Sequence, residues 1–118
     1  MSYRLDLLPD DGVIALRFDG SVTVGERFQA MRDVVSQHEA SGYTRLLADF
    51  SRADVAEASN EEIDAYATAL AREPAMRRLR IAYVGEKRQT TGVEYIAALR
   101  GYFFQRFATQ AEALRWLA

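Results

Sequence analysis

Short apolar runs alternate with longer amphipathic stretches along almost the whole chain. The first two apolar runs cover residues 3–8 and 13–18, and the segment between them contains Pro9 and Gly12. These residues are typical of a tight turn, because proline fixes φ and glycine permits positive φ. The pattern therefore predicts an opening β-hairpin, which we expect to end at residues 19–21.

Three more apolar runs predict strands, and four stretches with helical spacing separate or follow them. The predicted strands are residues 44–50, 79–84 and 102–107, with residues 51–58 as a loop. The predicted helices are residues 24–39, the stretch from Ser59 to Pro74, the stretch from Thr91 to Gly101, and residues 110–117. Pro74 is expected to end the second helix, because proline disrupts a helix interior.

One four-residue pattern opens each predicted helix: a Ser or Thr, any two residues, and a glutamate. The four copies begin at Thr23, Ser59, Thr91 and Thr109. In such a capping box the hydroxyl accepts a hydrogen bond from the backbone N–H three residues later, and the glutamate accepts one from the N–H of the cap residue. The pattern therefore marks four helix starts.

The predicted elements follow one another in the order β-β-α-β-α-β-α-β-α. Alternating strands and helices favour parallel strands with right-handed crossovers, whereas the opening hairpin adds one antiparallel strand. We therefore predict an α/β fold with a five-stranded mixed, largely parallel sheet and four helices. The length of 118 residues suits one domain, residues 1–118.

Three segments carry a resemblance to a known family. They are Leu-Leu-Ala-Asp-Phe-Ser at residues 46–51, Leu-Arg-Ile-Ala-Tyr-Val-Gly at residues 79–85, and Phe107 with residues 113–117. In these segments and in element order the chain resembles the STAS family of bacterial anti-sigma-factor antagonists and sulfate-transporter domains, and above all its small uncharacterised members. The resemblance implies a STAS-like fold and a regulatory role in protein binding.

The antagonists of that family carry an Asp-Ser-Ser-Gly-Leu type of stretch, in which a partner kinase phosphorylates a serine. The corresponding stretch here is residues 55–62, which lacks the Gly-Leu pair. The acceptor position would fall on Ala58 or Ser59. The resemblance therefore implies the fold, and we infer no kinase regulation from it.

Composition removes several kinds of chemistry. The chain has no Cys and a single His, His38, which excludes disulfides, a cysteine nucleophile and a multi-histidine metal site within one chain. A formal net charge of −2 gives no general attraction to nucleic acid or anionic membranes, and no apolar run approaches the ~20 residues of a membrane span. We expect a cytoplasmic protein with no cofactor, no bound metal, no nucleic-acid partner and no membrane contact.

Ligands of parallel α/β sheets bind beyond the carboxyl ends of the strands. Asp19, Asp49 and Ser51 lie at predicted strand ends, so we expect them at one rim of the sheet. For the two aspartates the alternative is a loop-fixing hydrogen bond.

The helix starts add three more candidates to this rim. Ser59 is a helix cap or a point of phosphorylation or partner recognition. Lys87 and Thr91 would hold an anion or belong to a solvated loop.

Three functions remain open. The first is a non-enzymatic STAS-like protein-interaction and regulatory module, and the second is a small-ligand or anion-binding domain that uses the rim. The third is an enzyme that uses Asp49 with Ser51 or Ser59, which we rank last because the sequence offers no catalytic set. We also expect a weak homodimer through the aromatic-rich strand at residues 102–107, if that strand lies at a sheet edge.

Overall fold

The computed structural model describes residues 2–85 and 93–118. In chain order the elements are β1 (Tyr3–Leu8), β2 (Val13–Val22), α1 (Val24–Ser41), β3 (Arg45–Val55), α2 (Asn60–Arg72), α3 (Pro74–Arg78), β4 (Arg80–Val84), α4 (Val93–Leu99), β5 (Gln105–Phe107) and α5 (Gln110–Leu117). The strands form one sheet in the order β1-β2-β3-β4-β5, in which β1 is antiparallel to β2 and all other neighbours are parallel. The predicted five-stranded mixed sheet is confirmed.

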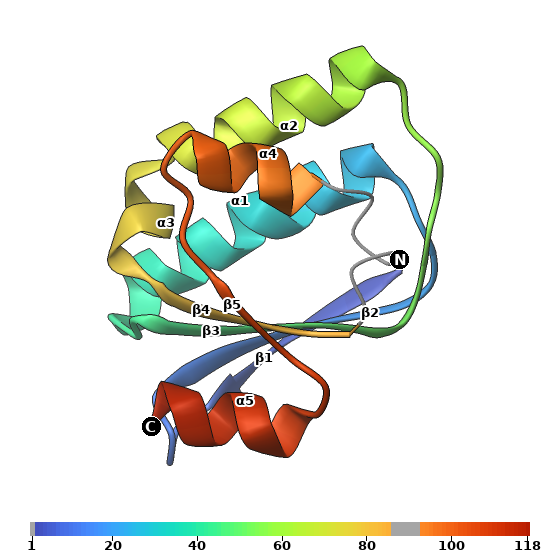
Figure 1. Cartoon of the computed structure of the whole chain (residues 1–118). Coiled ribbons are helices and arrows are strands. Elements are labelled where there is room, and N and C mark those ends of the chain that lie inside the picture. Colours follow the sequence, from blue (N-terminus) through green and yellow to red (C-terminus); the bar gives the residue numbers. More distant parts are fainter. Residues whose placement is uncertain (1, 86–92) are drawn as a thin grey trace.

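The helices lie in two unequal layers on the two faces of the sheet. Helices α1 to α4 cover one face, and α5 lies alone against the other (Figure 1). Within the described ranges no helix combines the length and the apolar character that a membrane crossing requires.

Each strand divides its side chains between two cores, because successive residues of a strand point to opposite faces. On β2, Ile14 and Leu16 belong to the large core beneath α1 to α4, whereas Val13 and Ala15 belong to the small core beneath α5. This division explains why the central strands read as continuous apolar runs in the sequence.

The predicted caps are confirmed where the structure describes them. Thr23 and Ser59 open α1 and α2 with complete reciprocal capping boxes. The Thr109 hydroxyl accepts from the backbone N–H of Glu112 at the start of α5. Thr91 lies outside the described residues.

The prediction of four helices is wrong, because the described residues contain five. Pro74 ends α2, as expected, but it also begins α3. Glu73 accepts a hydrogen bond from the Ala75 N–H at 3.3 Å, and Pro74 occupies the first turn, where it needs no hydrogen-bond donor.

Three strand bounds also differ from the prediction. Strand β2 continues through residues 19–21 to Val22, and β3 continues through much of the expected loop to Val55. The polar residues of these extensions pair with each other at the end of the sheet. The last strand begins only at Gln105, because Tyr102 turns inward to the large core.

Candidate functional site

Helix α4 buries its one charged residue along with part of its apolar side, and it exposes two large apolar side chains. Glu94 is fully buried, whereas Tyr95 and Leu99 are 69% and 72% exposed. Ala98 is also exposed, so the outward side of this helix carries no charged residue. A helix at a protein surface ordinarily shows the reverse pattern.

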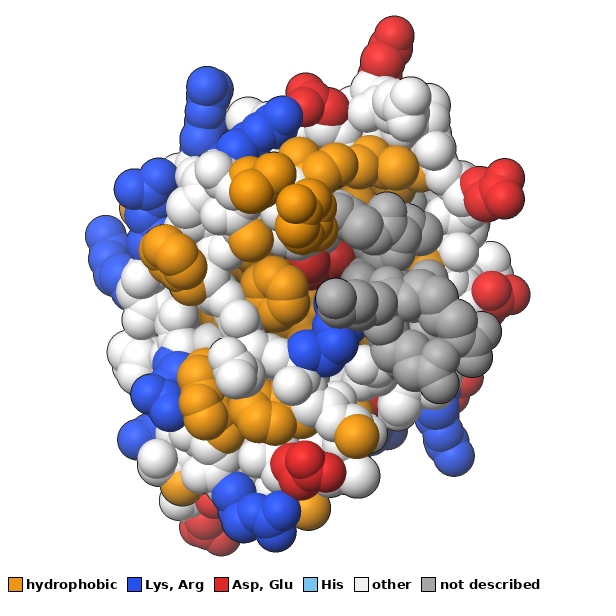
Figure 2. Space-filling view, in the orientation of Figure 1, with side chains coloured by type: hydrophobic (Ala, Val, Ile, Leu, Met, Phe, Trp, Pro, Cys, Tyr) orange, Lys and Arg blue, Asp and Glu red, His pale blue; other side chains and the backbone are white. Residues whose placement is uncertain are grey.

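The exposed apolar stripe continues beyond the helix. Phe103 follows four residues after Leu99 and is 77% exposed. We call Tyr95, Ala98, Leu99 and Phe103 the α4 face. Figure 2 shows hydrophobic side chains gathered on this side of the molecule, over α4. Exposed apolar residues that cluster in this way mark interaction sites more often than singly scattered ones do.

A buried ion pair fixes the inward side of α4. The Glu94 carboxylate contacts the guanidinium of Arg27 on α1, and both side chains are fully buried. The guanidinium carbon also lies 5.1 Å from the ring centre of Phe50 and 4.9 Å from that of Tyr66, which adds cation–π attraction. Burial lowers the pKa of Arg27, but Glu94 and the nearby tyrosines raise it above its ordinary value, so the guanidinium is charged.

Three buried tyrosines surround this pair. The hydroxyls of Tyr83 and Tyr102 lie 2.7 Å apart and share a hydrogen bond. Burial raises the pKa of Tyr66 to about 12, and it raises the pKa of Tyr83 and of Tyr102 well above the ordinary value. These hydroxyls are therefore neutral at ordinary pH, and the ion pair supplies the formal charges of this cluster.

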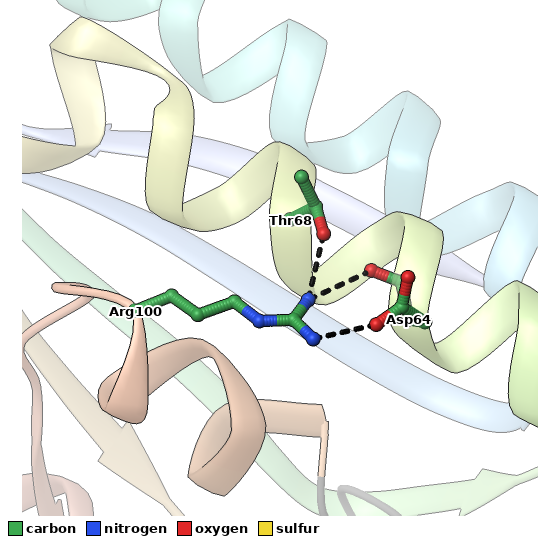
Figure 3. A network of polar contacts seen from close by, with 3 residues as sticks. All are labelled: Asp64, Thr68 and Arg100. Carbon is green, nitrogen blue, oxygen red and sulfur yellow. Dashed lines mark hydrogen bonds and ion pairs between the residues drawn. The ribbon is translucent and has the colours of Figure 1, made fainter.

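A second contact joins α4 to α2 at the surface. Arg100, just after α4, donates to the Asp64 carboxylate at 2.6 Å and to the Thr68 hydroxyl at 2.7 Å (Figure 3). Both partners lie on α2, one turn apart. The pair is partly exposed and therefore adds little stability, but it fixes the orientation of the end of α4.

A separate cleft of about 260 Å³ is lined by residues of β1, β2 and β3. Three of the residues expected at the rim, Asp19, Asp49 and Ser51, line it together. Arg17 and Arg4 also line it. By strand alternation Arg17 and Asp49 point to the same face as Ala15 and Leu47, which is the face that α5 covers only in part.

A β-bulge shapes this cleft. Arg17 pairs with Asp49 and Asp19 with Arg52, so two residues of β3 stand opposite Phe18 of β2. The Ser51 N–H donates to the Asp49 carboxylate at 2.8 Å. This hydrogen bond uses one Asp49 oxygen and lies at the bulge within β3, where the sequence predicted a loop.

The other predicted site residues do not join this group. Ser59 caps α2: its hydroxyl accepts from the Glu62 N–H, and the Glu62 carboxylate accepts from the Ser59 N–H, both at 3.1 Å. Lys87 and Thr91 lie outside the described residues. Within the described residues, no group of three His, Asp or Glu side chains is placed to hold a metal ion.

Sequence reasoning missed Arg27 and Glu94. We assigned Glu94 to a capping box, but its carboxylate contacts Arg27, 67 residues away. The sequence did hold one signal: Arg27 lies three residues from Val24 and from Ala30, which places a charged residue on the buried stripe of α1.

The layers and sheet order define the SpoIIAA-like α/β fold of the STAS class. Among solved structures, the anti-sigma factor antagonist SpoIIAA in its unphosphorylated form matches with a TM-score of 0.65 and 14% identity, over 98% of this chain and 96% of that protein. An uncharacterized DUF3478-family protein with a SpoIIAA-like fold from Shewanella loihica PV-4 matches with a TM-score of 0.63 and 19% identity, over 98% and 92%. No family model and no curated protein matches the sequence. The resemblance predicted from the sequence is therefore confirmed at the level of fold.

Proposed function

We propose that this chain is a non-enzymatic protein-interaction module that docks through the α4 face. The observation that carries the proposal is the outward side of α4, where Tyr95 and Leu99 are exposed while the charged Glu94 is buried. Burying apolar surface is the main driving force of protein association, so an apolar stripe kept in water favours a partner. SpoIIAA, which has a similar fold, is an anti-sigma factor antagonist, and this supports the same class of function.

In the purified protein the partner is a second copy of the chain. A two-fold axis brings the same patch of two copies together, so the apolar patch of one copy can cover that of the other. The α4 face comprises few residues, and a contact well below the size of stable interfaces gives a weak dimer. The homodimer predicted from the sequence is thereby assigned to α4 rather than to the edge strand, since Tyr102 and Phe104 pack against the large core.

Sedimentation velocity between one and one hundred micromolar tests this proposal. We expect the sedimentation coefficient of the natural protein to rise with concentration, and Leu99→Lys to abolish the rise. Leu7→Lys is the matched control, because Leu7 on β1 is also an exposed leucine but lies outside the α4 face. A monomer at every concentration, or equal effects of the two variants, contradicts the proposal.

The cleft favours a second function, the binding of a small ligand. The observation is that Asp19, Asp49 and Ser51 line one cleft beside the β-bulge between β2 and β3. Native mass spectrometry of the purified protein tests this function. A retained small molecule that is lost in Asp49→Ala supports it, and a mass equal to that of the bare chain contradicts it.

A further inference from the structure

Three charged residues form a row across the floor of the cleft. Arg4 on β1 is the register partner of Arg17 on β2, which is in turn the partner of Asp49 on β3. Register partners point to the same face of a sheet, so the three side chains lie side by side. All three line the cleft.

Within this row Arg17 and Asp49 attract each other, whereas Arg4 and Arg17 repel each other. Like charges directly opposite each other on antiparallel strands destabilise the pairing, and Arg4 and Arg17 are such a pair. Arg4 is partly compensated, because its Nε donates to the Asp6 carboxylate at 2.9 Å. The Nε of Arg17 is buried and has no hydrogen-bond partner among the described residues. This buried donor without a partner is costly, and the repulsion between Arg4 and Arg17 favours an anionic group beside them.

The groups around the row limit the chemistry of that acceptor. Arg17 and Arg4 offer guanidinium donors, which bind planar carboxylates through paired hydrogen bonds. Asp49 offers an acceptor beside them, since only one of its oxygens receives the Ser51 N–H. Asp19 lies 4.0 Å from Arg52 across the same cleft, so a second carboxylate opposes ligands of high negative charge. A ligand with one carboxylate and an adjacent hydrogen-bond donor fits both the two arginines and the Asp49 carboxylate.

We propose that the cleft binds a small α-amino or α-hydroxy acid, with its carboxylate on Arg17 and Arg4 and its amino or hydroxyl group on Asp49. The volume of about 260 Å³ suits a molecule of this size. This inference rests on the second function above and is independent of the α4 face.

The test is a titration followed by ¹⁵N–¹H NMR of the arginine Nε–H groups, with three probes. L-Serine carries the carboxylate and the donors, acetate carries only the carboxylate, and ethanolamine carries only the donors. We expect a saturable shift of the Arg17 signal with L-serine, at least ten-fold weaker binding of acetate, and no saturation with ethanolamine. In Arg17→Gln we expect at least ten-fold weaker binding of L-serine. In the control Arg78→Gln, an exposed arginine on α3, we expect binding within two-fold of the natural protein.

A stability measurement separates binding from folding. A binding role predicts that the urea midpoint of Arg17→Gln without ligand equals that of the natural protein, because the variant removes both the repulsion from Arg4 and the attraction to Asp49. A lower midpoint means that Arg17 serves the fold, and it overturns the inference.

The titration overturns the inference in two further ways. Equal affinities for L-serine and acetate overturn the ligand class while leaving ligand binding in place. No saturable shift with any probe overturns the site itself. Neither result bears on the sedimentation test of the α4 face.

Discussion

Helices α4 and α5 are similar in length and lie on opposite faces of the sheet, but they use their sequences in opposite ways. In α5, Ala113 and Leu117 are buried and Arg115 is exposed, as in an ordinary amphipathic helix. In α4, Glu94 is buried and Leu99 is exposed. The two helices show that a charged residue can be buried beside apolar ones while large apolar residues of the same helix stay exposed.

The difference arises from the partners that the two faces of the sheet offer. The core beneath α5 contains only apolar side chains among its buried members. The layer beneath α4 contains Arg27, and a buried arginine requires a counter-charge. Glu94 supplies it, which orients α4 with Val93 and Ala97 inward and with Tyr95 and Leu99 outward.

The largest effect is expected from breaking that pair. We expect Glu94→Ala to lower the free energy of unfolding by about 3–5 kcal/mol, because it leaves the Arg27 charge buried without its carboxylate. Urea denaturation measures the change. Glu39→Ala, at an exposed position of α1, is the control and should fall within about 0.5 kcal/mol of the natural protein.

A double variant separates the cost of an unpaired buried charge from the cost of lost side-chain packing. Arg27→Met with Glu94→Leu replaces both charges by apolar groups, and we expect it to recover most of the loss. If Glu94→Ala is as stable as Glu39→Ala, the pair does not orient α4.

Two leucines sharpen the comparison of the helices directly. We expect Leu117→Ala on α5 to cost about 2–5 kcal/mol, because this side chain is 1% exposed in a packed core. Leu99→Ala on α4 should change stability by less than about 0.5 kcal/mol, because the side chain is 72% exposed. Thermal or urea denaturation of the two variants in parallel checks this. Similar costs at both positions would mean that Leu99 is packed and the α4 face does not exist.

The raised pKa values of the buried tyrosines lead us to predict that high pH destabilises the layer around α4. Burial raises the pKa of Tyr66 from 10.0 to about 12. The neutral hydroxyl is therefore favoured in the folded state, and this contribution is complete below pH 10 and lost as pH rises through 12. One pKa unit corresponds to about 1.4 kcal/mol, so the loss from Tyr66 is roughly 2–3 kcal/mol.

Urea midpoints between pH 9 and pH 12 measure this loss, and tyrosinate absorbance reports the ionisation. Tyr83 and Tyr102 shift in the same direction and add to the fall. In Tyr66→Phe we expect a smaller fall than in the natural protein. A midpoint that stays constant over this range contradicts the burial of these hydroxyls.

A modest effect is expected at the caps. We expect Ser59→Ala to destabilise the chain by about 0.5–2 kcal/mol, because it removes the acceptor for the Glu62 N–H at the start of α2. Thr109→Ala should have an effect in the same range at the start of α5. An unchanged urea midpoint for Ser59→Ala would show that this cap does not contribute to the stability of α2.

The fold was predictable because its signals are local. Strand alternation and capping boxes act over a few residues, so strand order and the starts of α1, α2 and α5 follow from the sequence. Helix α3 was missed because Pro74 is compatible both with a helix end and with a first turn. The extensions of β2 and β3 were missed because their polar residues resemble a loop.

The sites were predictable only in part, because they depend on contacts between distant residues. The sequence placed Asp19, Asp49 and Ser51 together because it set them near predicted strand ends, but this reason was wrong, since they lie within β2 and β3. Arg17 and Arg4 stand beside them only through the register of β1 and β2, and the strand pattern alone does not show that α5 leaves them uncovered.

The central claim is that the outward side of α4 is a protein-binding surface, and a dilution series of ¹⁵N–¹H NMR spectra tests it residue by residue. We predict concentration-dependent shifts of the backbone amides of Tyr95, Ala98, Leu99 and Phe103, while the amides of α5 stay unchanged. Shifts confined to β5 (Gln105–Phe107), or no shifts anywhere up to one millimolar, would contradict the claim.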